Sequence, residues 1–344
     1  MNEAQTHMKN ARRNRIASAA LTISLSLGSA QAAIFQDPQL ESLQEAGKYA
    51  ELEQQAQARL KANANDAEAR AALSLALSFL DPGDVERVEA GAQQARLCID
   101  QHPAAAVCHL AGAQNLGQQM LNMGMFKAMR SVGSLKNAWI RTLELDPGSF
   151  TARVQLAKLY VTLPGLMGGS TSSARELEAA VRVSQPETAR IIRVYIAGAD
   201  ENWAEMESEL YALKGAKDAA MLGEIREATL QLALACLTDD ENLPKARSLY
   251  ETLVREQPRR AEGYYGLGRV HIALGELDEG IGLFERARSL DGANEVPIDH
   301  RLGDAYLAKG EKAQAKAAYE RFVANKRANP ANLEEVRESL DKLG

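Results

Sequence analysis

Apolar residues recur at helical spacing along most of the chain, most clearly over residues 261–292. This stretch predicts two short amphipathic helices joined by a turn at Leu274-Gly275-Glu276. A single hairpin of this size cannot cover both of its apolar faces, so the pattern indicates that further hairpins pack against it. The side chains expected inside are Tyr264, Leu267, Val270 and His271 from the first helix, and Leu277, Ile281, Phe284 and Ala287 from the second.

Prolines divide most of the remaining chain into units of similar length. Pro103, Pro147, Pro186, Pro258 and Pro330 each follow an apolar-periodic run, at separations of 44, 39, 72 and 72 residues. Proline just past a helix end cannot continue the helix, so these residues mark hairpin boundaries, and each long interval splits into two units. We therefore expect hairpins at 38–62, 66–101, 104–147, 150–185, 187–215, 218–258, 261–292 and 296–329, with a capping helix at 333–343.

The order of residues in 261–292 resembles the tetratricopeptide repeat, whose period is about 34 residues. Leu267-Gly268 follows an aromatic residue, His271 comes three residues later, and Phe284 is followed by Ala287. The same order returns in 296–329, where Gly303 lies 35 residues after Gly268, and part of it is found in 150–186. The resemblance implies an all-α, right-handed α-solenoid of about eight hairpins over residues 33–344, which would bind a protein or peptide partner without a cofactor.

Residues 1–32 have the pattern of a signal peptide. Three arginines, Arg12, Arg13 and Arg15, precede an apolar run from Ile16 to Leu27, and Ala30-Gln31-Ala32 supplies small residues for cleavage. The run is much shorter than the roughly 20 residues that span a bilayer, which favours cleavage over anchoring. We therefore expect a periplasmic or secreted protein that does not insert into the membrane after cleavage.

The charge distribution limits the choice of partner. Without residues 1–32 the chain carries 36 Lys and Arg against 45 Asp and Glu, a net charge of −9. Such a chain is a poor candidate for binding nucleic acid or an anionic membrane surface. The charge is also uneven, because 187–243 carries 12 acidic and 5 basic residues whereas 101–143 carries four basic residues and no acid.

The methionines and a glycine-rich insert suggest a second binding surface. Met125 and Met129 share a helix face with other apolar residues, and Met167 lies in the insert 163–170. Thioethers can bind Cu(I), but adaptable apolar packing or a partner-binding surface is the commoner use. The Pro-Gly-x-x-Gly-Gly-Ser insert resembles one in a subgroup of secreted bacterial tetratricopeptide proteins. It favours a structural turn over a phosphate cradle, because no Lys follows the glycines.

Two cysteines could form a disulfide. Cys98 and Cys108 each lie five residues from Pro103, on helices that the turn brings together, and an exported protein meets an oxidising compartment. The alternative is a pair of buried free thiols. A zinc site with the neighbouring histidines is disfavoured, since Cys108 and His109 point about 100° apart on a helix.

Catalytic motifs are absent from the sequence, which contains no His-Glu-x-x-His, Gly-x-Ser-x-Gly or Gly-x-Gly-x-x-Gly. We therefore expect a non-enzymatic interaction scaffold of the bacterial cell envelope, without a metal site. The alternative is a periplasmic solenoid that binds a small molecule for a transporter, with its pocket in the third hairpin and the 164–170 insert.

The resemblance also implies where a partner would bind, because the first helix of each tetratricopeptide hairpin lines the concave side. Tyr265 and Arg269 lie four residues apart and would place an aromatic ring beside a guanidinium that could hold a peptide carboxylate or backbone. The alternative is that Arg269 pairs with a charge in its own repeat. The side chains expected to be exposed in the groove are Lys158, Thr162, Tyr265, Arg269, His300 and Asp304.

The first testable prediction concerns export. Cleavage between Ala32 and Ala33 should give a mature chain that starts at Ala33, because the small residues of Ala30-Gln31-Ala32 suit signal peptidase. N-terminal sequencing of the protein from its host checks this, and a retained Met1 or Met8 would contradict it.

Overall fold

The computed structural model describes residues 33–238, 242–325 and 330–343, so the expected signal peptide lies outside the described residues. These residues form α-helices with two short 3₁₀ turns and no strand, apart from one isolated bridge between Arg260 and Asp291. The helices are α2 (Pro38–Glu45), α3 (Tyr49–Ala62), α4 (Ala67–Leu80), α5 (Val85–Gln101), α6 (Ala106–Leu121), α7 (Met125–Leu145), α8 (Phe150–Thr162), α9 (Thr171–Val181), α10 (Pro186–Ala199), α11 (Trp203–Ala212), α12 (Ala219–Leu237), α13 (Leu243–Glu256), α14 (Ala261–Ala273), α15 (Leu277–Arg288), α16 (Ile298–Ala308), α17 (Lys312–Ala324) and α18 (Pro330–Leu343). The 3₁₀ turns are η1 (Gly165–Met167) and η3 (Ala293–Glu295).

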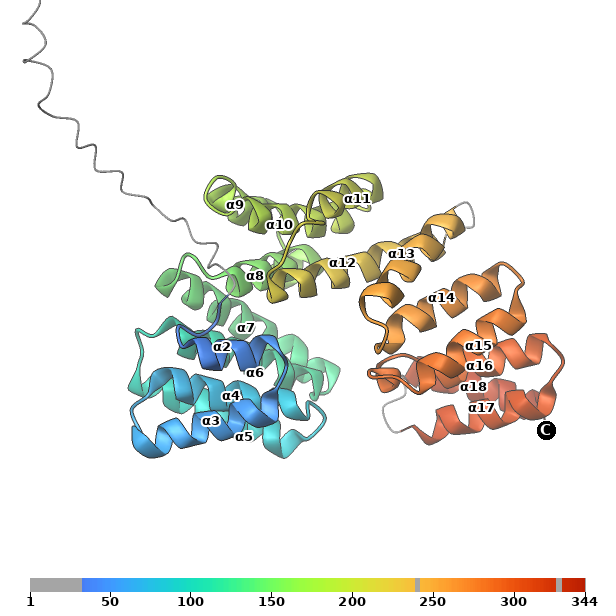
Figure 1. Cartoon of the computed structure of the whole chain (residues 1–344), viewed down its shortest axis with the longest axis horizontal. Coiled ribbons are helices and arrows are strands. Elements are labelled where there is room, and N and C mark those ends of the chain that lie inside the picture. Colours follow the sequence, from blue (N-terminus) through green and yellow to red (C-terminus); the bar gives the residue numbers. More distant parts are fainter. Residues whose placement is uncertain (1–32, 239–241, 326–329, 344) are drawn as a thin grey trace, which may run out of the picture. The chain divides into compact units, whose positions relative to one another are not determined.

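Consecutive helices pair into eight hairpins, from α2–α3 to α16–α17, and α18 covers the last of them (Figure 1). First helices of neighbouring hairpins also contact each other, in the pairs α4 and α6, α8 and α10, and α14 and α16. The buried apolar residues accordingly fall into five clusters that follow one another along the chain. The prediction of an all-α solenoid of helical hairpins is confirmed.

Local sequence explains where many helices begin. Asp66 accepts a hydrogen bond from the backbone N–H of Ala69 at 3.0 Å, and Asp218 accepts one from Met221 at 2.9 Å. Such N-cap side chains satisfy backbone donors that have no partner inside the helix. Gly275, with φ of 81°, turns the chain between α14 and α15 in the left-handed region that glycine adopts without strain.

Helix crossings in the C-terminal hairpins depend on glycines that face aromatic rings. A Cβ atom on Gly266 of α14 would lie 2.0 Å from Cε1 of Tyr250 on α13. The equivalent atom on Gly303 of α16 would lie 2.2 Å from Cε1 of Tyr319 on α17. Both tyrosines are buried, so the rings fill the space that these glycines leave.

A disulfide joins Cys98, near the end of α5, to Cys108 in α6, with the two Cα atoms 5.3 Å apart. Both residues are fully buried in the cluster formed by the first three hairpins. The bond therefore closes the turn around Pro103 between the second and third hairpins. Cys236, the third cysteine, is buried in α12.

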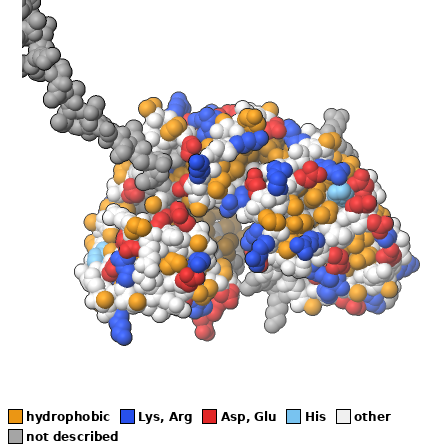
Figure 2. Space-filling model, in the orientation of Figure 1, with side chains coloured by type: hydrophobic (Ala, Val, Ile, Leu, Met, Phe, Trp, Pro, Cys, Tyr) orange, Lys and Arg blue, Asp and Glu red, His pale blue; other side chains and the backbone are white. Residues whose placement is uncertain are grey.

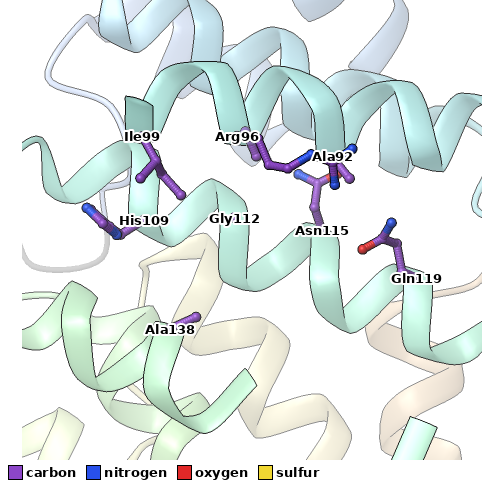
Figure 3. A pocket seen from close by; sticks show the side chains of 9 residues that line it. Ala92, Arg96, Ile99, His109, Gly112, Asn115, Gln119 and Ala138 are labelled. Carbon is purple, nitrogen blue, oxygen red and sulfur yellow. The ribbon is translucent and has the colours of Figure 1, made fainter. Parts of the chain in front are cut away.

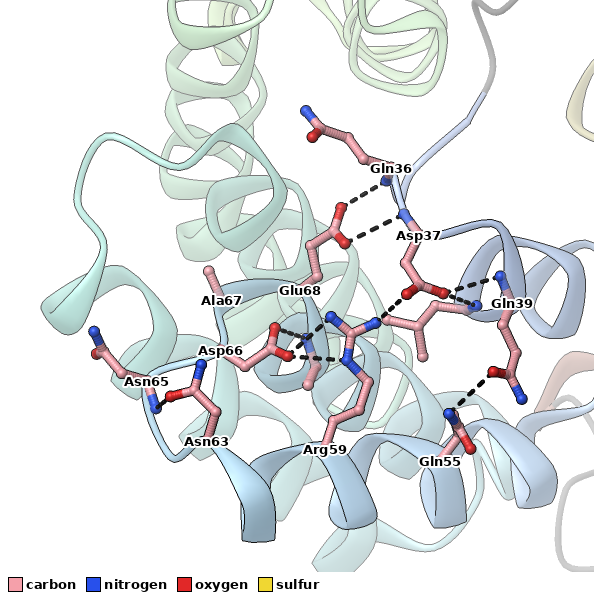
Figure 4. Close-up of polar contacts among 12 residues, drawn as sticks. Gln36, Asp37, Gln39, Gln55, Arg59, Asn63, Asn65, Asp66, Ala67 and Glu68 are labelled. Carbon is pink, nitrogen blue, oxygen red and sulfur yellow. Dashed lines mark hydrogen bonds and ion pairs between the residues drawn. The ribbon is translucent and has the colours of Figure 1, made fainter.

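The first described residues are tied to the second hairpin (Figure 4). Glu68 of α4 accepts hydrogen bonds from the backbone N–H groups of Gln36 and Asp37, at 2.6 and 3.3 Å. Arg59 of α3 bridges Asp37 and Asp66, at 2.5 and 2.9 Å. The Leu40 N–H, together with Arg59 and other donors, holds the pKa of Asp37 below its usual value. This network keeps the chain folded almost from Ala33 onward.

Among the described residues, no helix combines the length and the apolar character needed to cross a bilayer.

The glycine crossings give the second testable prediction. Gly266→Ala should lower the free energy of unfolding by roughly 1–3 kcal/mol, because the new methyl group collides with Tyr250. Gly282→Ala is the matched control, since a Cβ there meets no atom within 4 Å, and it should stabilise α15 by up to about 1 kcal/mol. Urea denaturation midpoints measure both, and equal midpoints for the Gly266 variant and the wild type would disprove the crossing.

Candidate partner-binding site

Two cavities lie on the side of the first helices, and each contains residues of the expected groove. The α6–α8 cavity has a volume of about 420 Å³ and the α12–α16 cavity one of about 320 Å³. The α6–α8 cavity is lined by Phe79, Ala113, Gln114, Gly117, Gln118, Leu135, Trp139, Gln155, Lys158, Leu159 and Thr162. The α12–α16 cavity is lined by Leu237, Arg269, Ile272, Ala273, Phe284, Arg301 and Asp304.

Lys158 lies at the edge of the α6–α8 cavity, but its charge is already neutralised. Its Nζ is 3.2 Å from Oε2 of Glu224 and 2.6 Å from Oε2 of Glu227, both on α12, and 5.0 Å from the ring centre of Tyr195. Gln155 also donates to Glu224, at 2.9 Å. A carboxylate from the sixth hairpin therefore binds two residues of the fourth, next to the cavity.

Tyr195 of α10 completes this bridge. Its hydroxyl donates a short hydrogen bond to the Glu224 carboxylate. Burial, followed by the charges of Glu224 and Glu227, raises the pKa of Tyr195 above its usual value, so the phenol remains a donor. The arrangement holds α8, α10 and α12 together.

The α12–α16 cavity combines an apolar wall with two guanidinium groups. Arg301 pairs with Asp304 at 2.8 Å, and Asp304 also accepts a hydrogen bond from the Tyr319 hydroxyl at 2.8 Å. Arg269 lies 5.8 Å from the ring centre of Tyr265. No carboxylate of the described residues lies within 4.0 Å of Arg269, so its charge is available to a ligand. Figure 2 shows apolar side chains flanked by Lys and Arg over the C-terminal hairpins.

The expected exposure is wrong for two of the six groove residues. His300 is fully buried beside Tyr319 and Phe322, with ring centres 6.4 and 5.4 Å away, and Tyr265 is buried against Phe284 at 5.8 Å. Each first helix packs against its own partner helix and also against neighbouring hairpins, which leaves a narrower exposed stripe than two-helix geometry suggests. Lys158, Arg269 and Asp304 are half-buried and Thr162 is exposed, and all four line a cavity.

The methionine surface lies elsewhere. Met125 and Met129 are exposed on the first turns of α7, and Met167 is half-buried in η1. None of them lines either cavity, and neither does any residue of the 164–170 insert. The two cavities therefore contain neither the methionines nor the insert that were expected to form a small-molecule pocket.

A third cavity, of about 180 Å³, lies between α5, α6 and α7 (Figure 3). Asn115 points toward it from α6 but is already hydrogen-bonded to Ser74 at 2.6 Å and to the Ala111 carbonyl at 2.8 Å. The cavity is smaller than the roughly 300 Å³ at which ligand pockets begin, and we do not consider it a site.

Sequence reasoning missed Glu224 and Arg301. Glu224 lies 66 residues from Lys158, and nothing in their spacing indicates that they meet. Arg301 could have been found, because it precedes Asp304 by three residues on one helix, a spacing that favours ion pairs. No group of three or more His, Cys, Asp or Glu side chains within the described ranges is arranged to hold a metal ion.

Comparisons with known proteins agree with this architecture. The family model described as "Tetratricopeptide repeat" matches residues 300–325. The crystal structure of yeast Tom70 matches with a TM-score of 0.58 and 15% identity, over 88% of this chain and 60% of that chain. A chain of the APC/C hetero-tetramer Cut9–Hcn1 matches with a TM-score of 0.53 and 14% identity, over 88% of this chain and 55% of that chain. No curated protein matches the sequence.

At these identities the two structures establish the fold alone, and the chain spans only about 60% of the length of the first. Together with the matched repeat, they support a tetratricopeptide-repeat protein built as an all-α solenoid. Such a fold suggests protein partners in general terms.

The burial of His300 gives the third testable prediction. Burial lowers the pKa of His300 from its usual value of 6.5, with Arg301 acting in the same direction and Asp304 and Glu335 opposing it. The unfolded chain then binds a proton that the folded chain excludes, so this group reduces stability as pH falls through 6.5. Urea denaturation at pH 7.5 and 5.5 should show a larger loss of stability for the wild type than for His300→Gln. Equal losses for the two proteins would contradict the assignment.

Proposed function

We propose that this protein is a non-enzymatic interaction scaffold whose protein or peptide partner binds in the α12–α16 cavity. The observation that carries the proposal is Arg269, a half-buried cation of α14 without a carboxylate partner among the described residues. Structural ion pairs satisfy most neighbouring arginines, including Arg260 and Arg301. A guanidinium that is held over an aromatic ring and open to a cavity is suited to an anionic group of a partner.

The rest of the cavity specifies more about that group. Asp304 offsets the charge of Arg301, which leaves the Arg269 charge in excess. Leu237, Ile272 and Phe284 form an apolar surface beside it. The cavity therefore fits a carboxylate next to an apolar side chain, as on an acidic peptide segment.

The cell envelope is the proposed place of action. The pattern of residues 1–32 supports export, and the buried Cys98–Cys108 disulfide is typical of proteins from oxidising compartments. Proteins built from tetratricopeptide repeats are generally scaffolds rather than enzymes. We extend both properties to this chain as part of the proposal.

The α6–α8 cavity favours a second candidate function, the binding of a small molecule for a transporter. Its volume of about 420 Å³ lies in the range of ligand pockets. The side-chain carbonyl oxygens of Gln114 and Gln118 are buried there without a hydrogen-bond partner among the described residues. A small molecule that raises the melting temperature of the protein would favour this function over the scaffold.

The fourth testable prediction separates the groove from the rest of the surface. A photo-reactive phenylalanine analogue at Ala273, which lines the α12–α16 cavity, should crosslink to a partner protein in the host. The same analogue at Gly282, which is exposed on α15, should not. Arg269→Ala should lower the crosslink at Ala273 at least several-fold, because the partner loses a charged hydrogen bond.

Arg286→Ala is the matched control. Arg286 also lies over a tyrosine, 6.0 Å from the ring centre of Tyr264, but it is exposed on α15 outside the cavity. Its removal should leave the crosslink unchanged. An equal effect of the two substitutions, or crosslinks from Gly282 alone, would rule out the cavity as the partner site.

A further inference from the structure

Large apolar side chains are exposed in an uneven pattern. Fourteen large apolar side chains are strongly exposed among the described residues, and seven of them lie where the first helix of a hairpin connects to the second, in hairpins two to four. Isolated exposed apolar residues need no explanation, but this concentration in three consecutive connections does. The seven are Leu80, Val85, Leu121, Met125, Phe126, Met129 and Leu166.

The first two connections touch each other and the third lies beside α7, and we call the surface made by the three connections and the first turns of α7 the loop edge. Asn122, between α6 and α7, donates to the carbonyl of Pro82, between α4 and α5, at 2.8 Å. Gly168 of the insert lies beside Lys136 of α7, since a Cβ built on it would be 2.6 Å from the Lys136 Nζ. The side chains project strongly, with Leu121 78% and Phe126 79% exposed and Leu166 fully exposed.

Basic residues accompany the apolar ones. Lys127 and Arg130 are exposed on the first turns of α7, and Lys136 follows two turns later. Within the described residues no carboxylate lies within 4.0 Å of these three cations. Three acids, Asp81, Asp84 and Glu86, lie at the α4–α5 end of the edge, where Asp81 and Asp84 accept backbone hydrogen bonds. The excess positive charge therefore lies at the α7 and insert end.

This local charge matters more than the net charge of −9 that argued against a membrane surface. Exposed charges farther apart than about 8–10 Å are largely screened at physiological salt, so a surface responds to the charges in its own neighbourhood. Residues 101–143 contain no acid, and four of the seven exposed apolar side chains of the loop edge, Leu121, Met125, Phe126 and Met129, fall within the same segment.

We propose that the loop edge is a peripheral contact surface for anionic phospholipid. Leu121, Phe126 and Leu166 enter the boundary between headgroups and acyl chains, and Lys127 and Arg130 meet the lipid phosphates. A bilayer accepts protruding apolar side chains without a complementary shape. None of the three cavities described above is lined by these residues, so the edge offers none of those cavities to a protruding part of a protein partner.

Co-sedimentation with vesicles tests the proposal. The experiment uses the chain from Ala33, the first described residue, because the apolar run of residues 16–27 would itself bind lipid. The chain should sediment with vesicles of phosphatidylglycerol and phosphatidylcholine and much less with phosphatidylcholine alone. The double variant Met125→Gln, Phe126→Gln should lower partitioning at least tenfold, because the apolar anchors are lost.

The double variant Lys127→Gln, Arg130→Gln tests the contribution of the basic residues to vesicle binding. Partitioning should fall about fivefold for each cation removed, which corresponds to the attraction of one basic residue to an anionic surface. Higher salt should reduce the difference between wild type and variant, since screening weakens the same attraction.

A matched control and three contrary outcomes complete the design. Val183→Gln with Tyr211→Gln replaces two exposed apolar side chains away from the loop edge, and partitioning should be unchanged. Equal binding to anionic and neutral vesicles, or equal losses for the two apolar pairs, would overturn the proposal. A protein crosslink from the loop edge without vesicle binding would do the same and would identify a protein-docking surface. The proposal that a partner binds in the α12–α16 cavity rests on other residues, so the cavity proposal and the lipid proposal can fail independently.

Discussion

A helical hairpin of about 30 residues cannot bury both of its faces by itself, and the whole structure depends on this constraint. Each hairpin completes its core against the next, and the buried clusters accordingly follow the chain from the first hairpin to α18. Gly266 and Gly303 let neighbouring helices approach until aromatic rings fill the space between them. At the C-terminal end α18 supplies Val336, which is buried with Tyr319 and Phe322.

The same constraint explains where the candidate sites are. Packing between first helices is close in several neighbouring pairs, but residues of α6 and α8 line one cavity and residues of α12, α14 and α16 line another. Glu224 reaches from α12 to Lys158 and Tyr195 and bridges three hairpins beside the first cavity. Because most charges near the cavities are paired within the protein, Arg269, which has no carboxylate partner in the described part of the chain, stands out as available to a partner.

Charge has to be considered at the scale over which it acts. The net charge affects solubility and the general choice of partners. The potential at a given surface, however, depends mainly on the charges close to it, because salt screens the more distant ones. The segment 101–143 is basic and ends in exposed apolar helix turns, whereas 187–243 is acidic. Two cationic surfaces can therefore exist on a chain of net negative charge, the Arg269 cavity proposed for an acidic peptide and the loop edge proposed for anionic lipid.

The sequence by itself determined the fold class and the approximate hairpins, because apolar periodicity, proline spacing and glycine turns are local properties. It also predicted that Lys158, Thr162, Arg269 and Asp304 lie on first helices, where each of them lines a cavity. Only the tertiary structure decided which of these side chains stay accessible. His300 and Tyr265 are buried because neighbouring hairpins cover a face that looks free in an isolated hairpin, and Lys158 is neutralised by Glu224, which lies 66 residues away. Helical periodicity records which face of a helix is apolar, whereas burial and ion pairing between hairpins depend on how the repeats stack in space.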